Sequence, residues 1–304
     1  MDTILVSVIC RAYNHSGFIN KTLLGLVNQK TSFKYEVIVH DDASTDGTTE
    51  VIKQFAEKYP DIIVPIYQNV NQYSKNILIN KVYIYPIIRG KYIAMCEGDD
   101  YWISDDKLQK QVDYIEKHDN CYCVCCGAII RNYLDNSEKA YHIMKHSGVL
   151  SIANIVTNGG DYIPTCSMLM RKEVRLSIPD DFSIPSVGDL QIPIYASLLG
   201  YVYYIDSIMC QYNYGVPGSW TVRANSLSEA QQTERLNNLI KFYSMLEEKY
   251  LPTNQALKKK ISKLYAKRYY LYGIKPDQDI TKYFSGYKSK VLYILGYFKK
   301  ILRK

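Results

Sequence analysis

The feature that most constrains this chain is a regular alternation, within its first hundred residues, of short apolar runs and segments with helical periodicity. The apolar runs have strand length and few interruptions, as is typical of strands covered on both faces. They are residues 4–10, 35–40, 62–67 and 92–96. Apolar residues at helical spacing occupy residues 18–27, the stretch that Ser44 or Thr45 can cap, and about residues 75–88. The alternation predicts an α/β fold with a Rossmann-like, mostly parallel sheet flanked by helices.

The net charge of +7 is unevenly divided along the 304 residues. Residues 251–304 hold fourteen Lys and Arg but only two acids, Asp277 and Asp279, which is a charge of +12 and leaves −5 for the first 250 residues. A mildly acidic body with a basic tail argues against a nucleic-acid-binding core, because such cores concentrate basic charge. The remaining composition, 47% hydrophobic and 22% charged, is that of an ordinary globular protein.

The start of the chain lacks the basic and small-residue segments of a secretory signal, and no run of about 18 apolar residues could span a bilayer. We therefore expect a cytoplasmic protein with reduced cysteines. Four of the eight cysteines crowd into residues 121–126, which would suit either a soft-metal site or a buried strand that uses Cys as a small hydrophobe. We favour the strand, because the spacing is not CxxC and no His cluster follows.

Two pairs of neighbouring carboxylates each follow a predicted parallel strand: Asp41 with Asp42, and Asp99 with Asp100. Ligands of parallel sheets gather at the carboxyl ends of the strands. Acids that converge there need a cation, and hard divalent ions bind one or two carboxylates together with substrate phosphates. Either pair alone could be a capping loop or a surface turn, but both at matching strand ends favour a metal–diphosphate site.

Three segments carry a resemblance to a known family: residues 6–14 (VSVICRAYN), 40–48 (HDDASTDGT) and 90–102 (GKYIAMCEGDDYW). In order and spacing they resemble the opening strand, the Asp-rich loop and the DxD segment of the family-2 glycosyltransferases. The likeness covers about residues 4–221. It implies a GT-A fold and an inverting transferase of the type that builds bacterial cell-surface polysaccharides.

The resemblance also implies a site for a nucleotide-sugar donor, most often a UDP-sugar. The implied donor-binding residues are Arg11, Tyr13, Asp42, Glu97, Asp99 and Asp100. Asp42 falls where a carboxylate of the family accepts a hydrogen bond from uracil. Asp99 falls at the metal-binding acid of DxD and Glu97 at its first position, so both are implied ligands of Mn²⁺ or Mg²⁺.

A further acid is required as the general base, because the attacking sugar hydroxyl must lose its proton. The family places this acid at the start of a helix after the donor-binding part, and residues 186–190 (SVGDL) match that position with Asp189. The resemblance therefore implies that Asp189 is the catalytic base. Asp180 and Asp181 lie nearby and rank well below it.

One segment departs from the family. Residues 212–221 (YNYGVPGSWT) align with a motif in which Arg follows the first Tyr and a His binds the diphosphate or metal. Asn213 stands in place of that Arg, and Gly215 stands in place of that His. The departure removes one implied ligand and leaves strict metal dependence open.

The basic tail ends in a segment, residues 288–304, that places an apolar stripe beside Lys and Arg at helical spacing. This pattern favours a helix lying on an anionic membrane surface, such as the inner face of the cytoplasmic membrane. The alternative is a solvated basic face on helices that pack against the rest of the chain. No nucleic-acid recognition motif accompanies the charge.

We therefore expect a catalytic domain over residues 1–225 and a helical, basic region over residues 226–304. The nucleotide sugar would bind within about residues 1–102 and the acceptor within about residues 103–225. The predicted activity is hexosyl or N-acetylhexosaminyl transfer to a hydroxyl of a saccharide or lipid-linked saccharide in polysaccharide or lipopolysaccharide biosynthesis. The alternatives are a nucleotidyltransferase and an inactive sugar-nucleotide-binding or membrane-docking protein.

Overall fold

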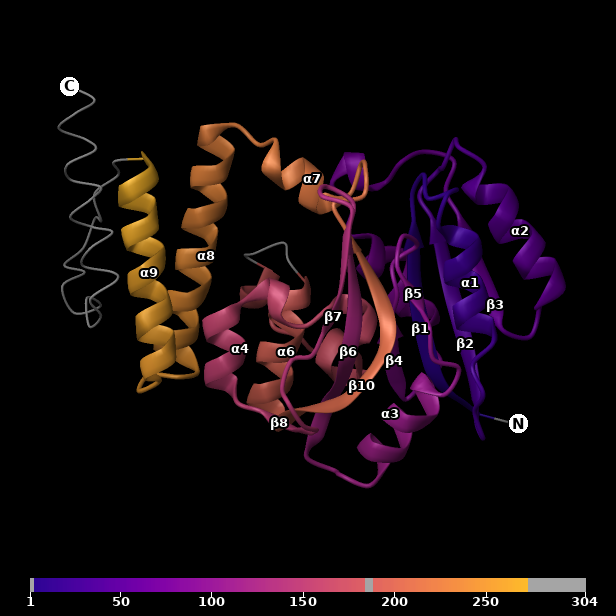
Figure 1. Ribbon diagram of the computed structural model, residues 1–304, viewed down its shortest axis with the longest axis horizontal. Coiled ribbons are helices and arrows are strands. Elements are labelled where there is room, and N and C mark those ends of the chain that lie inside the picture. The colour runs from indigo at the N-terminus through magenta and orange to yellow at the C-terminus, as the bar shows by residue number, and fades with distance from the viewer. Residues whose placement is uncertain (1–2, 184–187, 273–304) are drawn as a thin grey trace. The chain divides into compact units, whose positions relative to one another are not determined.

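A ten-stranded sheet forms the centre of the first of two compact units, in a computed structural model that describes residues 3–183 and 188–272 (Figure 1). The strands are β1 (Ile4–Ala12), β2 (Lys34–Asp41), β3 (Ile63–Tyr67), β4 (Tyr92–Met95), β5 (Tyr101–Trp102), β6 (Cys121–Asn132), β7 (Ser137–Tyr141), β8 (Gly148–Leu150), β9 (Leu169–Arg171) and β10 (Tyr201–Tyr214). Hydrogen-bonded neighbours follow the order β3-β2-β1-β4-β9-β6-β10-β5, with β7 beside β6 and β8 beside β10.

The four strands predicted from the apolar runs are adjacent and parallel, in the order β3-β2-β1-β4. Their burial agrees with their sequence, since Val6 to Cys10 of β1 are buried on both faces of the sheet. Beyond β4 the sheet is mixed: β9 is antiparallel to both β4 and β6, whereas β6 and β10 are parallel. The predicted α/β fold with helices beside a central sheet is confirmed.

The helices of the first unit are α1 (Ile19–Val27), α2 (Thr48–Lys58), α3 (Lys107–Glu116) and α5 (Glu173–Leu176). The prediction that Ser44 or Thr45 caps α2 is wrong, because Gly47, with a φ of 98°, precedes the helix and no side chain caps it. Instead the hydroxyl of Ser44 donates to Oδ1 of Asp41 at 2.5 Å. The polar residues of this loop therefore hold the end of β2.

The predicted helix over residues 75–88 is not formed as one element. The segment contains three short helical turns, η1 (Tyr73–Lys75), η2 (Asn80–Ile84) and η3 (Tyr85–Ile87). Asn76 has a φ of 57°, a left-handed conformation that ends the first turn. Pro86 lacks the amide hydrogen that a continuous helix would need there.

In the described part of the chain, the second unit comprises residues 151–162, 178–183, 188–194 and 218–272. Its described helices are α4 (Ile152–Asn158), the first part of α6 (Gly188–Leu199), α7 (Trp220–Asn225), α8 (Glu229–Lys249) and α9 (Gln255–Tyr272). Ser228 and Gln231 form a capping box that begins α8, and α8 and α9 lie side by side (Figure 1). The predicted membrane helix over residues 288–304 lies outside the described residues.

The eight cysteines are all buried and unpaired. Residues 121–126 belong to β6, which confirms the prediction that these cysteines lie in a buried strand. Burial raises the pKa of the Cys123 and Cys125 thiols well above their usual range, so these groups stay protonated and apolar. Among the described helices, none combines the length and the apolar character needed to cross a bilayer.

Candidate functional site

The predicted donor-site residues meet at one edge of the sheet. Because β1 lies between β2 and β4 and all three are parallel, their carboxyl ends share this edge. Arg11 stands near the end of β1, Asp42 follows β2, and residues 97–100 follow β4. Backbone hydrogen bonds tie both loops to β1: the amide of Asp42 donates to the Ala12 carbonyl at 3.0 Å, and the amide of Gly98 donates to the Arg11 carbonyl at 2.8 Å.

Asp42 is buried, with 4% of its surface exposed, and its carboxylate faces the segment after β3. The amide of Gln72 donates to Oδ1 at 2.7 Å and the amide of Tyr73 donates to Oδ2 at 3.0 Å. Each carboxylate oxygen can accept a second hydrogen bond, so a nucleobase could still be bound there. Tyr13, at 41% exposure, presents an open ring near the same strand ends.

Arg11 and Glu97 form a two-point ion pair across this edge. Nη2 of Arg11 lies 2.6 Å from Oε1 of Glu97, and Nε donates to Oε2 at 3.1 Å. The Glu97 carboxylate raises the pKa of the Arg11 guanidinium, which is therefore fully charged. In this arrangement Glu97 compensates Arg11, and its role as a metal ligand stays a prediction.

Asp99 is largely buried and lies near His15. Its side chain is only 15% exposed, and Nε2 of His15 lies 4.0 Å from its Oδ2. Burial, with a further contribution from the charge of Glu97, raises the pKa of the Asp99 carboxyl. Gly98 makes the approach of His15 possible, because a Cβ at position 98 would lie 2.6 Å from Nδ1 of that imidazole.

Asp100 is held from β10. Its Oδ1 accepts a hydrogen bond from the Asn213 amide at 2.8 Å, and Nδ2 of Asn213 donates to the Asp99 carbonyl at 2.5 Å. Burial and the charge of Asp99 raise the pKa of the Asp100 carboxyl well above its usual range. Asn213, which stands where the family motif has Arg, therefore orients the turn that carries both acids.

Two residues of this edge were missed by the sequence analysis. His15 has a buried Nδ1 with no hydrogen-bond partner in the described part of the chain. Arg175 is 9% exposed, its guanidinium lies 5.6 Å from the centre of the Tyr85 ring, and burial lowers its pKa. The position of His15 directly after the Tyr13-Asn14 end of β1 was the available signal, whereas nothing in the sequence marked Arg175.

A divalent cation fits part of this site. Within the described ranges, the only side chain that forms an ion pair with the largely buried Asp99 carboxylate is His15, at 4.0 Å, and Nδ1 of that imidazole has no hydrogen-bond partner there. Divalent ions accept a donor set of this kind. No three His, Cys, Asp or Glu side chains of the described ranges stand close enough to hold an ion alone. Asp99 therefore fits an ion whose remaining ligands come from substrate phosphates and water.

Asp189, the predicted base, belongs to the second unit and stands in the first turn of α6. Its Oδ1 is buried and has no hydrogen-bond partner among the residues that the structure describes. Burial, followed by the charge of Asp161, raises the pKa of Asp189 to about 7. Gly160 lets the chain lie against this carboxylate, because a Cβ there would stand 3.1 Å from Oδ1.

Helices α8 and α9 complete the surroundings of Asp189 within the second unit. Burial and the charge of Asp189 raise the pKa of Tyr243 on α8. Lys260 on α9 donates to the Thr157 carbonyl at 3.0 Å, and a Cβ at Gly159 would stand 3.2 Å from its Nζ. These two helices thus hold the loop that covers the base, a contribution that the family likeness, which ends before them, does not imply.

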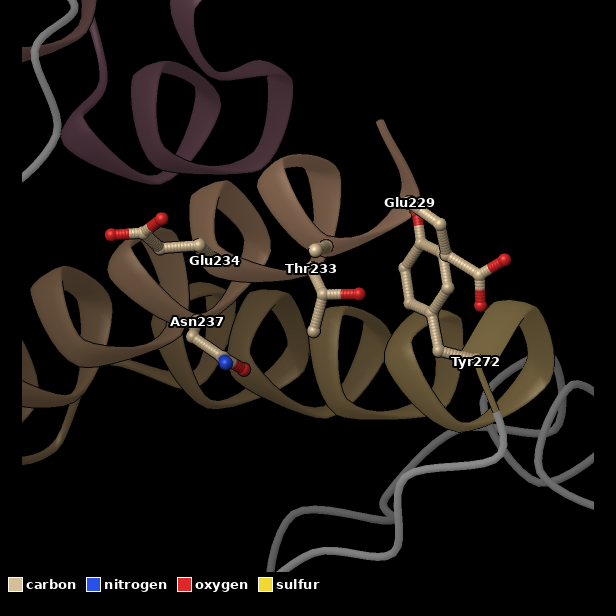
Figure 2. Close-up of a pocket in the computed structure, with 6 residues that line it drawn as sticks. Glu229, Thr233, Glu234, Asn237 and Tyr272 are labelled. Carbon is tan, nitrogen blue, oxygen red and sulfur yellow. The ribbon is translucent and has the colours of Figure 1, made fainter. Parts of the chain in front are cut away.

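Asp181, one of the two lower-ranked acids, pairs with Lys249 on α8 at 2.5 Å. Its side chain is 42% exposed, as is typical of a surface ion pair. A pocket with a volume of about 550 Å³ lies along α8 and α9. Figure 2 shows side chains that line it. The pocket is lined by Glu229, Ala230, Thr233, Glu234, Asn237 and Tyr272, none of them a predicted site residue.

Comparison with known sequences assigns the first part of the chain to a family. The family described as Glycosyl transferase family 2 matches residues 7–175. An uncharacterized protein of Mycobacterium tuberculosis is 40% identical over 113 residues, which are 37% of this chain and 32% of that protein. The UDP-Glc:alpha-D-GlcNAc-diphosphoundecaprenol beta-1,3-glucosyltransferase WfaP of Escherichia coli is 33% identical over 112 residues, which are 37% of this chain and 41% of that protein. The matches thus span less than half the length of these curated relatives.

Solved structures resemble almost the whole chain. The structure of Staphylococcus aureus TarS 1–349 with UDP-GlcNAc has a TM-score of 0.61 at 15% identity and covers 96% of this chain and 79% of that one. The mannosyltransferase PcManGT of Pyrobaculum calidifontis, solved with GDP-Man and Mn²⁺, has a TM-score of 0.55 at 16% identity and covers 99% and 88%. At these identities the likeness establishes the fold.

Proposed function

Because the chain belongs to glycosyl transferase family 2, with a GT-A fold, we propose that it is an inverting glycosyltransferase. It moves a hexosyl or N-acetylhexosaminyl group from a nucleotide-diphosphate donor to a hydroxyl of a saccharide or lipid-linked saccharide. A UDP-sugar is the proposed donor, which is supported by the name of WfaP and by TarS having been solved with UDP-GlcNAc. The diphosphoundecaprenol in the name of WfaP supports an acceptor of polysaccharide or lipopolysaccharide biosynthesis.

One observation carries this proposal: Arg11, Asp42 and Asp99 converge at the carboxyl edge of three adjacent parallel strands. Asp42 binds the nucleobase and the ring of Tyr13 stacks on it. Arg11 stands ready to bind the diphosphate, whose negative charge increases as the bond to the sugar breaks. The burial of Asp42 strengthens its hydrogen bond to the base, because little water competes for it.

Asp99 holds the divalent cation, Mn²⁺ or Mg²⁺, with Glu97 as the second candidate ligand once it leaves Arg11. The Mn²⁺ in the PcManGT structure supports this assignment. When bound, the ion neutralises charge on the departing diphosphate. Asp100 and Asn213 hold the turn that carries Asp99, so the ion would be bound in a prepared position.

Asp189 takes the proton from the acceptor hydroxyl. With a pKa of about 7 it is partly ionised at neutral pH, which suits a general base, and its unpartnered Oδ1 is free to accept that proton. The acceptor oxygen forms a bond to the anomeric carbon as the bond to the diphosphate breaks. Attack from the face opposite the leaving group inverts the configuration at that carbon.

The proposal is tested with the full chain, a panel of nucleotide sugars with Mn²⁺, and a panel of free and lipid-linked saccharides. Asp189→Asn should retain donor binding and lower transfer by about 10²-fold or more, because general-base catalysis contributes at least that much. The exposed Asp61→Asn serves as the matched control and should leave transfer unchanged. Donor binding without any transfer by the unaltered protein would favour an inactive sugar-nucleotide-binding protein instead.

We also propose that the protein acts in the cytoplasm as a peripheral protein of the inner membrane face. The basic, amphipathic pattern of residues 288–304 supports this placement. An acceptor carried on a lipid would then be within reach of a chain that lies against the same bilayer. A nucleotidyltransferase finds no support, since no Gly-rich, basic phosphate loop follows β1.

A further inference from the structure

The segment between β3 and β4 exposes an unusual amount of apolar surface. Its exposed apolar side chains, which we call the apolar patch, are Val70, Tyr73, Ile77, Leu78, Val82 and Ile87. They are six of the fifteen large hydrophobic residues that are exposed in the described part of the chain, within only 18 residues. Leu78 and Val82, at 66% and 50% exposure, are the most open of its aliphatic members. Concentrations of this kind mark contact surfaces, whereas single exposed apolar residues do not.

The exposure is a property of the folded segment. Ile79 and Ile84 point inward and are 8% and 0% exposed, so they anchor the segment to the unit below. The amide of Val82 donates to the Leu78 carbonyl at 3.0 Å, which places these two side chains one turn apart on the same outer face. A segment that is apolar on both its inner and its outer face therefore has the character of a contact surface on its outer side.

The charges of this region have one sign. Residues 62–96 contain no Asp or Glu but four basic residues. Two of these are used within the fold, since Arg89 pairs with Glu36 and Lys91 pairs with Glu116. The other two, Lys75 and Lys81, are exposed beside the apolar patch and make no ion pair with any described residue. The patch is therefore flanked by uncompensated positive charge.

The apolar patch adjoins the donor site. The same two amides that bind the Asp42 carboxylate belong to Gln72 and Tyr73, so the segment that carries the patch also closes the predicted nucleobase site. Tyr83 extends this connection, because its hydroxyl donates to Oε1 of Gln72 at 3.2 Å. Whatever binds the patch will lie close to the bound donor.

We propose that the apolar patch, with Lys75 and Lys81, rests on the surface of an anionic lipid bilayer. The apolar side chains would contact the acyl boundary of the bilayer, and the two lysines would be attracted to its negatively charged headgroups. This contact is separate from the one proposed for residues 288–304. It deepens the proposed function, on which its meaning for a lipid-linked acceptor rests, but lipid binding itself requires no catalysis.

The test measures binding of the full chain to vesicles of equal parts phosphatidylglycerol and phosphatidylcholine, by co-sedimentation, without donor or acceptor. Leu78→Ser with Val82→Ser, and separately Lys75→Gln with Lys81→Gln, should each weaken binding about tenfold or more. The matched control, Leu134→Ser with Val149→Ser, removes exposed apolar residues at 60% and 55% exposure elsewhere in the same unit and should bind as the unaltered protein does. All four proteins should bind vesicles of phosphatidylcholine alone much more weakly.

Two results would overturn the inference. Equal vesicle binding by the patch variants and the unaltered protein would assign membrane contact to other residues or to none. A loss of oligomeric mass in the patch variants, with vesicle binding unchanged, would identify a second copy of the chain as the occupant. Donor hydrolysis in the absence of vesicles should stay within about twofold in every variant, so a failed lipid contact and a failed catalytic assignment are told apart.

Discussion

Among single residues, Asp189 has the most informative chemistry. A carboxylate with a buried, unpartnered oxygen and a pKa of about 7 is costly to keep in a folded protein. Oδ1 has no hydrogen-bond partner among the described residues, and burial outweighs the charge of Arg235, which lowers the pKa. Such destabilising groups are kept where they serve function. Replacing Asp189 should therefore lower activity and raise the free energy of unfolding.

Asp189→Asn should therefore stabilise the fold in a pH-dependent way. The pKa is about 7 in the folded chain and about 4 in the unfolded chain, so the stability that the protonated Asp189 confers is complete below pH 4 and is lost as the pH rises through 7. Asn does not ionise, and the variant should gain at most about 4 kcal/mol at pH 8 and almost nothing at pH 4. Urea denaturation at pH 4, 6 and 8 measures the difference. A difference that is constant with pH would contradict the assigned pKa.

Asp161→Asn should lower the pKa of Asp189, because the charge of Asp161 is the second cause of its elevation. We expect a decrease of roughly half a pH unit, as for a partly screened neighbouring charge. Carboxyl ¹³C NMR titration measures this pKa, with the signal assigned by its absence in Asp189→Asn. The exposed Asp113→Asn is the control and should leave the titration unchanged, whereas an unchanged midpoint in Asp161→Asn would contradict the account.

At the scale of helices and strands, the sequence predicted those elements that have continuous apolar patterns. Strands β1, β2 and β4 were predictable because their runs are buried on both faces, and their parallel order then placed Asp42 and Asp99 at one edge. Strand β9 has three residues, which is too short for a periodic signal. The prediction of one helix over residues 75–88 was wrong, because apolar spacing does not indicate that Asn76 adopts a left-handed conformation.

The candidate site was likewise predictable only in part. Motif positions predicted its acids, but their partners are set by tertiary contacts that no local pattern encodes. In the sequence, Asn213 was noted only as the residue that replaces an Arg of the family motif. In the structure it lies on β10 and its hydrogen bonds support the Asp99-Asp100 turn. The loop that covers Asp189 is held by Lys260, which lies 103 residues after Thr157, its partner in that loop.

Asn213→Ala should loosen the turn after β4. The variant loses the side-chain donor to the Asp99 carbonyl while the backbone bond to Asp100 remains, at a cost of about 1–2 kcal/mol in stability. We expect affinity for UDP in the presence of Mn²⁺ to fall about tenfold, because Asp99, the proposed metal ligand, is less well positioned. Calorimetric titration measures it, and the exposed Asn120→Ala should bind as the unaltered protein does. Unchanged affinity in Asn213→Ala would show that β10 does not position the acids.

At the scale of the whole molecule, we propose two separate lipid contacts, one at the basic tail and one at the apolar patch. Residues 251–304 carry +12, and the patch lies in a region without acids. Replacing Lys299 and Lys300 with Gln in the full chain should weaken binding to anionic vesicles by about tenfold or more at low salt and much less at 0.5 M salt. Sedimentation at both salt concentrations measures this effect, and equal binding at low salt would leave the tail without a membrane role.

The most direct test of the central claim is calorimetric titration of UDP, GDP and CDP into the full chain with and without Mn²⁺, for the unaltered protein and for Asp99→Asn. We predict that one of these nucleotides, UDP by our proposal, binds at least about tenfold more tightly with Mn²⁺. Asp99→Asn should abolish that difference, and the exposed Asp61→Asn should preserve it. If none of the nucleotides binds, or if Mn²⁺ tightens binding equally in Asp99→Asn, the assignment of a metal-assisted nucleotide-sugar site at this sheet edge is wrong.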